Sequence, residues 1–209
     1  MQRKIKFMGK RHFQNNFIVY FTLFIFLIVG IVIGSVLVNR LDGSEGYSIV
    51  KYFSPLIDYI DYGDQLSLDL FKASLISNVK FTIVIWLSGF IFIGMIIIPL
   101  MMALKGISIG MTVGYLIKEF GIKGFTFALS GLLPHYLILL PGILAICAIG
   151  LSNAKANSNL QGNSLKKINQ INLVEYSLLF LLFFSIIIMG SLVEAFTIPY
   201  FIKLTRLKL

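Results

Sequence analysis

Charged residues are scarce in this chain, and they are absent from two long stretches. Only 13% of the 209 residues are Asp, Glu, Lys or Arg, whereas a soluble domain carries about a quarter. The stretches Phe81–Leu104 and Gly124–Ala154 contain none of these residues, and 57% of the chain is hydrophobic. These values exclude an ordinary soluble domain. They predict an all-α, polytopic integral membrane helix bundle that forms a single membrane domain over residues 1–209.

The sequence also lacks the patterns that carry common chemistry. It has no phosphate-binding loop, no His/Cys cluster at zinc-ligand spacing and no nucleophile elbow. The one cysteine, Cys147, cannot form an intrachain disulfide. His12 lies in the basic N-terminal segment and is interpreted as a solvated residue. We therefore expect no enzymatic activity, no catalytic residues, no cofactor and no metal.

The net charge of +9 does not indicate nucleic acid as a partner. The basic residues stand at the ends of apolar runs, where they would contact anionic lipid headgroups. Membrane lipid and other membrane or extracytoplasmic proteins are the expected partners, and a homo-oligomer stays open. The expected location is the cell membrane, crossed several times.

The apolar runs predict about five spans. They are Phe17–Val38, Phe81–Pro99, a short glycine-rich segment Gly106–Ile117, the proline-broken run Gly124–Leu151 and Leu173–Phe196. A turn is expected within Pro99–Gly106. The third segment either begins near Leu100 and tolerates Lys105, or is re-entrant. The fourth is expected to be broken, or to consist of two half-helices that meet at Pro134, because interior prolines interrupt helical hydrogen bonding.

Two polar regions connect these runs. Arg40–Lys80 carries six acidic residues and is expected outside the cell, where Asp58, Asp61 and Asp64 are candidates for partner docking. Its amphipathic tract Ser67–Lys80 is interpreted as a helix on the membrane surface, or as a docking surface. The linker Ser152–Asn172 contains Lys155, Lys166 and Lys167 and no acidic residue, and it is expected to be a flexible cytoplasmic loop. The basic N-terminus is placed inside. The C-terminal tail then falls outside with five spans, or inside if the third segment is re-entrant.

Glycines at four-residue spacing mark candidate sites of helix packing. Gly106, Gly110 and Gly114 lie on one face of the third segment, and Gly30 and Gly34 form a second pair in the first span. In water each would cost a helix about 1 kcal/mol relative to alanine. In a bilayer the same spacing forms a flat face on which a second helix can pack closely.

Two titratable residues fall inside apolar segments. His135 lies between the two prolines of the fourth span, and Glu194 lies near the end of the last span. An ionisable residue within a membrane is a functional candidate. The alternatives are a neutral His135 that is bonded to carbonyls freed by Pro134, and an interfacial Glu194. If Glu194 is not at the interface, it is expected to be a partner for His135 or Lys105.

Several strings, in order along nearly the whole chain, resemble the stage II sporulation protein M family. They are GIVIGSVLVN at 30–39, LKG at 104–106 followed by the glycine ladder, GIKG at 121–124, LPHYLILLP at 133–141 and EAFTIP at 194–199. Many broader relatives carry a glycine and a glutamate where this chain has Tyr136 and Leu139.

The resemblance implies a non-enzymatic membrane scaffold. It would recruit peptidoglycan-degrading partners, stage II sporulation proteins D and P, for septal wall thinning and engulfment during endospore formation. The expected location is then the mother-cell membrane at the sporulation septum. The competing hypothesis is a membrane component of a small transporter or export system, such as one associated with a bacteriocin, because glycine-rich and proline-broken helices also line substrate paths.

Overall fold

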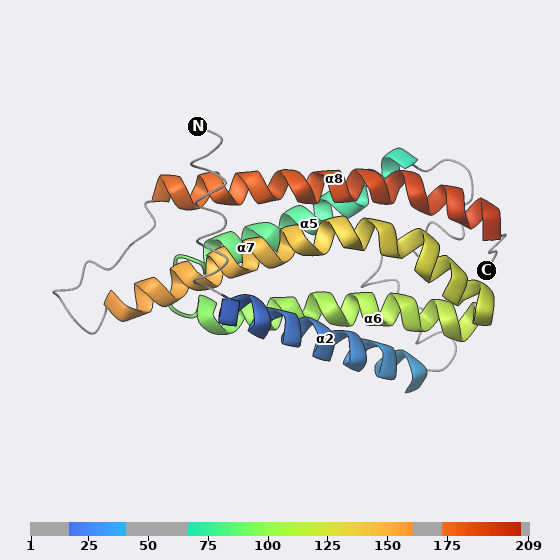
Figure 1. Ribbon diagram of the computed structural model, residues 1–209, viewed down its shortest axis with the longest axis horizontal. Helices are drawn as coiled ribbons and strands as arrows, with labels where there is room; N and C mark the ends of the chain where they lie inside the picture. Colours follow the sequence, from blue (N-terminus) through green and yellow to red (C-terminus); the bar gives the residue numbers. More distant parts are fainter. Residues whose placement is uncertain (1–16, 41–66, 161–172, 206–209) are drawn as a thin grey trace.

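The computed structural model describes residues 17–40, 67–160 and 173–205, and within them it contains helices and no strand. The elements are α2 (Phe17–Arg40), α5 (Ser67–Ser88), α6 (Gly94–Phe127), the π-helical turn η1 (Ala128–Leu132), α7 (Leu133–Leu160) and α8 (Leu173–Thr205). The helices lie side by side as an elongated bundle (Figure 1). The all-α membrane fold expected from the sequence is confirmed.

Four stretches of the described residues are long and apolar enough to cross a membrane: Phe17–Arg40, Phe71–Ser88, Gly94–Lys155 and Tyr176–Ile198. The third has 62 residues and folds back on itself (Figure 1). The reversal occurs at Gly121, whose φ of 56° and ψ of −128° are not helical. Four continuous stretches thus contain five helical arms, which explains the difference from the expected count of about five spans.

The arms alternate in direction (Figure 1). The start of α2, the turn between α5 and α6, the end of α7 and the start of α8 gather at one end of the bundle. The end of α2, the start of α5, the Gly121 reversal and the end of α8 gather at the other. The two arms that meet at Gly121 are therefore both full-length, and α6 runs through Lys105 without interruption.

The expected boundaries of the second and third spans are wrong. The turn between them lies at residues 89–93 and not within Pro99–Gly106, because α5 already ends at Ser88. Pro99 is accommodated inside α6. From Gly94 to Phe120 the first arm of α6 rises about 40 Å at 1.5 Å per residue, enough for a hydrocarbon core of roughly 30 Å. The glycine-rich helix is therefore longer than the segment predicted from the sequence.

The interpretation of Ser67–Lys80 as a surface helix is also wrong. The tract forms the first part of α5 and continues without a break into Phe81–Ser88. Its polar residues Ser74 and Asn78 are buried in the bundle, as is Thr82 one turn further along α5, whereas Phe71, Leu75 and Val79 are only half-buried. Lipid surrounds the bundle on the outside, so the polar face of an amphipathic helix turns inward.

Side chains from two other helices close the end of α5. The last carbonyl groups of a helix have no partner within it. The Asn153 side-chain amide of α7 donates to the Gly89 carbonyl at 3.0 Å, and the Tyr176 hydroxyl of α8 donates to the Trp86 carbonyl at 3.0 Å. The expected flexible loop Ser152–Asn172 begins later than the sequence indicates. Residues 152–160 are helical, because α7 continues to Leu160.

Two more predicted breaks differ from the structure. The fourth span does not split into half-helices at Pro134, because the α-helix changes only locally into the π-helical turn η1 and then resumes. Pro141 lies inside α7, and α8 runs past Pro199 to Thr205. A π-turn accommodates an irregularity in the hydrogen-bond ladder without ending the helix.

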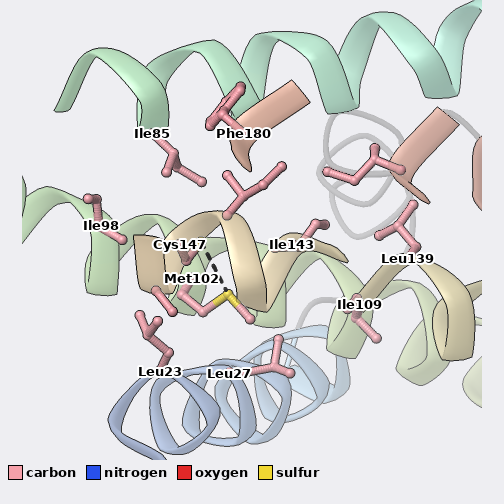
Figure 2. Packing of buried hydrophobic residues seen from close by; sticks show 13 residues of the cluster. Leu23, Leu27, Ile85, Ile98, Met102, Ile109, Leu139, Ile143, Cys147 and Phe180 are labelled. Atoms are coloured by element: carbon pink, nitrogen blue, oxygen red, sulfur yellow. Dashed lines mark hydrogen bonds between the residues drawn. The ribbon is translucent and has the colours of Figure 1, made fainter. Parts of the chain in front are cut away.

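The core takes residues from every helix (Figure 2). The larger cluster includes Leu23, Leu27, Ile85, Ile98, Met102, Ile109, Leu139, Ile143, Cys147 and Phe180. The Cys147 thiol lies 3.9 Å from the Met102 sulfur, in full burial. A second cluster towards the Gly121 end joins Val38, Met111, Tyr115, Leu116, Phe127, Leu132 and Ile198. The outer surface also carries many large apolar side chains, such as Phe21, Ile96 and Leu137, as expected for contact with lipid.

The alternation of the arms gives a testable orientation. With the basic N-terminus inside, the end of α7 also faces the cytoplasm. We expect a cysteine at Asn159, in a chain that also carries Cys147→Ala, to resist impermeant thiol reagents in intact cells. A Ser44→Cys chain is the accessible control. Equal labelling of both positions would contradict the five-arm orientation.

Candidate functional site

The helices α2 and α6 pack closely along a seam. Five glycines, at positions 30, 34, 106, 110 and 114, line this seam. Four-residue spacing places the glycines of each helix on one face. The α2 face packs directly on the α6 face: Gly30 and Gly106 face each other, and the remaining glycines of each helix face the backbone of the other helix. We call this contact the glycine seam.

The glycine seam leaves no room for a side chain at its centre. A Cβ on Gly30 would overlap the Ala103 carbonyl oxygen and lie 3.1 Å from the Cα of Gly106. A Cβ on Gly110 would overlap the Ile31 carbonyl oxygen and lie 2.9 Å from its carbonyl carbon. The seam opens slightly towards Gly114, where a Cβ would lie 3.2 Å from the Cα of Ser35. The two backbones are therefore in van der Waals contact.

His135 and Glu194 lie together inside the bundle, although they are distant in the sequence. His135 Nε2 of α7 is 3.9 Å from Glu194 Oε1 of α8, and the two side chains are 1% and 17% exposed. The π-turn that precedes Pro134 also meets α8, because the Thr197 hydroxyl donates to the Gly131 carbonyl at 3.4 Å. Glu194 is expected from the sequence either at the membrane interface or as a partner for His135 or Lys105, and the structure places it beside His135.

The polar residues of α5 extend this pair into a larger group. Ser74 Oγ donates a hydrogen bond to Glu194 Oε2. The Asn78 side-chain amide donates to Ser191 Oγ of α8 at 3.1 Å and to Ser74 Oγ at 3.4 Å. Lys105 Nζ of α6 donates to Asn78 Oδ1 at 3.0 Å and lies 5.7 Å from the centre of the Phe81 ring. We call Ser74, Asn78, Lys105, His135, Ser191 and Glu194 the polar cluster.

Sequence reasoning found part of the polar cluster. It singled out His135 and Glu194 and mentioned Lys105, but it missed Ser74, Asn78 and Ser191. The signal was present in α5, where Ser74, Asn78 and Thr82 recur at four-residue spacing and so share one face. Interpretation of the tract as a surface helix hides this signal, because a polar face is then expected to meet water. The docking candidates Asp58, Asp61 and Asp64, as well as His12, lie outside the described residues.

Comparison with known proteins identifies the family. No curated protein and no solved structure matches the chain. The family model described as Stage II sporulation protein M matches residues 22–199, which include the whole glycine seam and the polar cluster. The chain therefore belongs to the stage II sporulation protein M family, and it is a multi-pass membrane protein of that family.

Proposed function

We propose that this protein is a non-enzymatic scaffold in the mother-cell membrane at the sporulation septum. It would hold peptidoglycan-degrading partners, by resemblance stage II sporulation proteins D and P, while the septal wall is thinned and the membrane engulfs the forespore. Catalysis would belong to those partners.

The glycine seam is the observation that carries this proposal. Along it α2 and α6 touch backbone to backbone, so no substrate can pass between them unless the contact is lost. The polar cluster supports the same conclusion, because its hydrogen bonds run between its own members on α5, α6 and α8. A closely packed interior suits a protein that holds partners at a fixed place.

The segment between α2 and α5 is our proposed docking region. It would lie outside the cell in the orientation described above, and its acidic residues would steer and select a partner more than they stabilise the bundle. The C-terminal end of α8 reaches the same end of the bundle (Figure 1). Both would face the space in which peptidoglycan is remodelled.

A triple charge reversal tests the proposal. We expect Asp58, Asp61 and Asp64, each changed to Lys, to reduce the recovery of co-purified sporulation proteins D and P by about tenfold or more. The free energy of unfolding of the purified protein should stay within about 0.5 kcal/mol of the parent, because a docking region outside the bundle would leave these side chains in solvent, where substitutions have small effects. The measurement is quantitative mass spectrometry of complexes that are purified from sporulating membranes.

A second candidate function, transport, rests on the pair of His135 and Glu194. Ionisable residues within a membrane occur in ion and proton pathways. The matched variant is His135→Gln, which keeps a hydrogen-bonding side chain of similar size. As a scaffold, the protein should keep its partner recovery and engulfment with this change. Loss of engulfment in His135→Gln, together with an unaffected triple reversal, would reject the scaffold and favour transport.

A further inference from the structure

The hydrogen bonds between Lys105 and Glu194 all point in the same direction. Lys105 Nζ donates to Asn78 Oδ1, Asn78 Nδ2 donates to Ser74 Oγ, and Ser74 Oγ donates to Glu194 Oε2. Every donor in the series faces the carboxylate, and every acceptor faces the ammonium. The two charges fix this direction, since the reverse orientation of the Asn78 amide would place its NH₂ group against the ammonium.

The series joins a lysine at mid-depth in the membrane to a glutamate near the end of the last candidate span, Tyr176–Ile198. Lys105 lies eleven residues after the start of α6, about 16 Å along the helix, which is near the middle of a hydrocarbon core of roughly 30 Å. Asn78 and Ser74 are 3% and 7% exposed. An uncompensated charge at this depth is strongly unfavourable, whereas a lysine and a glutamate together are neutral.

The same residues tie α5 to two neighbours at one position. Asn78 bonds to Lys105 of α6 and to Ser191 of α8, and Ser74 bonds to Glu194 of α8. A shift of one residue along α5 would move these groups by 1.5 Å and turn them by about 100°, which breaks all of these bonds. Apolar contacts are not directional, so they discriminate less between neighbouring registers.

We propose that Lys105 and Glu194 form an intramembrane ion pair that is relayed through Asn78 and Ser74, with Asn78 as the residue that fixes the register of α5 against α6 and α8. This inference concerns the interior of the bundle and does not depend on the proposed function. A buried polar residue that specifies register is an established device in helix bundles.

The ion pair is tested by removing its charges singly and together. Lys105→Met and Glu194→Gln should each raise the unfolding equilibrium constant by about 100-fold or more, because each leaves the other charge uncompensated. The unfolding equilibrium constant of the double variant should be at least tenfold lower than that of either single variant. The measurement is reversible unfolding in mixed micelles, or, for a variant that accumulates poorly, the amount of folded protein recovered. A double variant whose loss equals the product of the two single losses would overturn the ion pair.

The relay is tested at Asn78 with a change of charge and not of size. Asn78→Asp places a second carboxylate between Lys105 and Glu194, so it should raise the unfolding equilibrium constant of the protein at least tenfold. Adding Glu194→Gln should restore the stability, because one cation then again faces one anion. Asn153 is the matched control, as a buried asparagine that bonds to the Gly89 carbonyl elsewhere in the bundle. Glu194→Gln should not restore the stability of the Asn153→Asp chain. If Glu194→Gln restored the Asn78→Asp and Asn153→Asp chains to the same extent, the relay would be overturned.

Discussion

Gly110→Leu is expected to destabilise the protein by about 3 kcal/mol or more, enough to cost it either its fold or its complex. The first atom of the new side chain would already overlap the Ile31 carbonyl oxygen, and that oxygen belongs to the backbone of α2, which cannot rotate away. The gain in helix propensity, about 1 kcal/mol, is too small to offset this overlap. The measurement is thermal unfolding in detergent together with the recovery of partners.

Two controls make the test specific to the glycine seam. Gly114→Ala lies one step further along the same face, where the new Cβ would be 3.2 Å from the Cα of Ser35, so a small adjustment accommodates it. Val113→Leu is half-buried on another face of α6 and should be tolerated. Equal stability of Gly110→Leu and Val113→Leu would mean that the seam does not hold α2 and α6 together.

Gly121→Ala should destabilise the protein by about 1–3 kcal/mol through the backbone alone. Gly121 has a φ of 56° and a ψ of −128° at the reversal between the two long arms, a conformation that L-residues with a Cβ adopt rarely. A Cβ there would have no heavy atom within 4 Å, so steric overlap with neighbours does not contribute. Thermal unfolding of the purified protein measures the change.

Ile122→Ala is the control for the reversal. Ile122 is the next residue and is 85% exposed, so its truncation should change stability by less than about 0.5 kcal/mol. If Gly121→Ala were as stable as Ile122→Ala, the reversal would not require a glycine.

The first helix could be predicted almost to the residue, whereas α5 could not. The run from Phe17 to Val38 is apolar on all sides, and α2 ends only two residues later, at Arg40. The tract Ser67–Lys80 has an apolar side and a polar side, and such a pattern fits two settings. It is typical of a helix on the membrane surface, and equally of a spanning helix whose polar side faces other helices. Only tertiary contacts distinguish these settings.

The glycines were easier to interpret than the turns. Four-residue spacing at Gly106, Gly110 and Gly114 identified the packing face, but nothing in the sequence indicates that Gly30 and Gly34 are its partner. The turn after α5 has no polar residue that would distinguish it from a helix, so the sequence indicates a boundary near Pro99 instead. Within the polar cluster, His135 and Glu194 stand out against apolar neighbours, whereas serine and asparagine gain significance only once α5 is placed inside the bundle.

The turn between α5 and α6 has a consequence for how the chain enters the membrane during synthesis. Residues 89–93 are Gly-Phe-Ile-Phe-Ile, and no charged residue occurs between Lys80 and Lys105. Retention of a loop on the cytoplasmic side depends on lysine and arginine close to the ends of the spans, and this loop has none. The orientation of these two helices must then be set by basic residues elsewhere in the nascent chain, first of all those that precede α2.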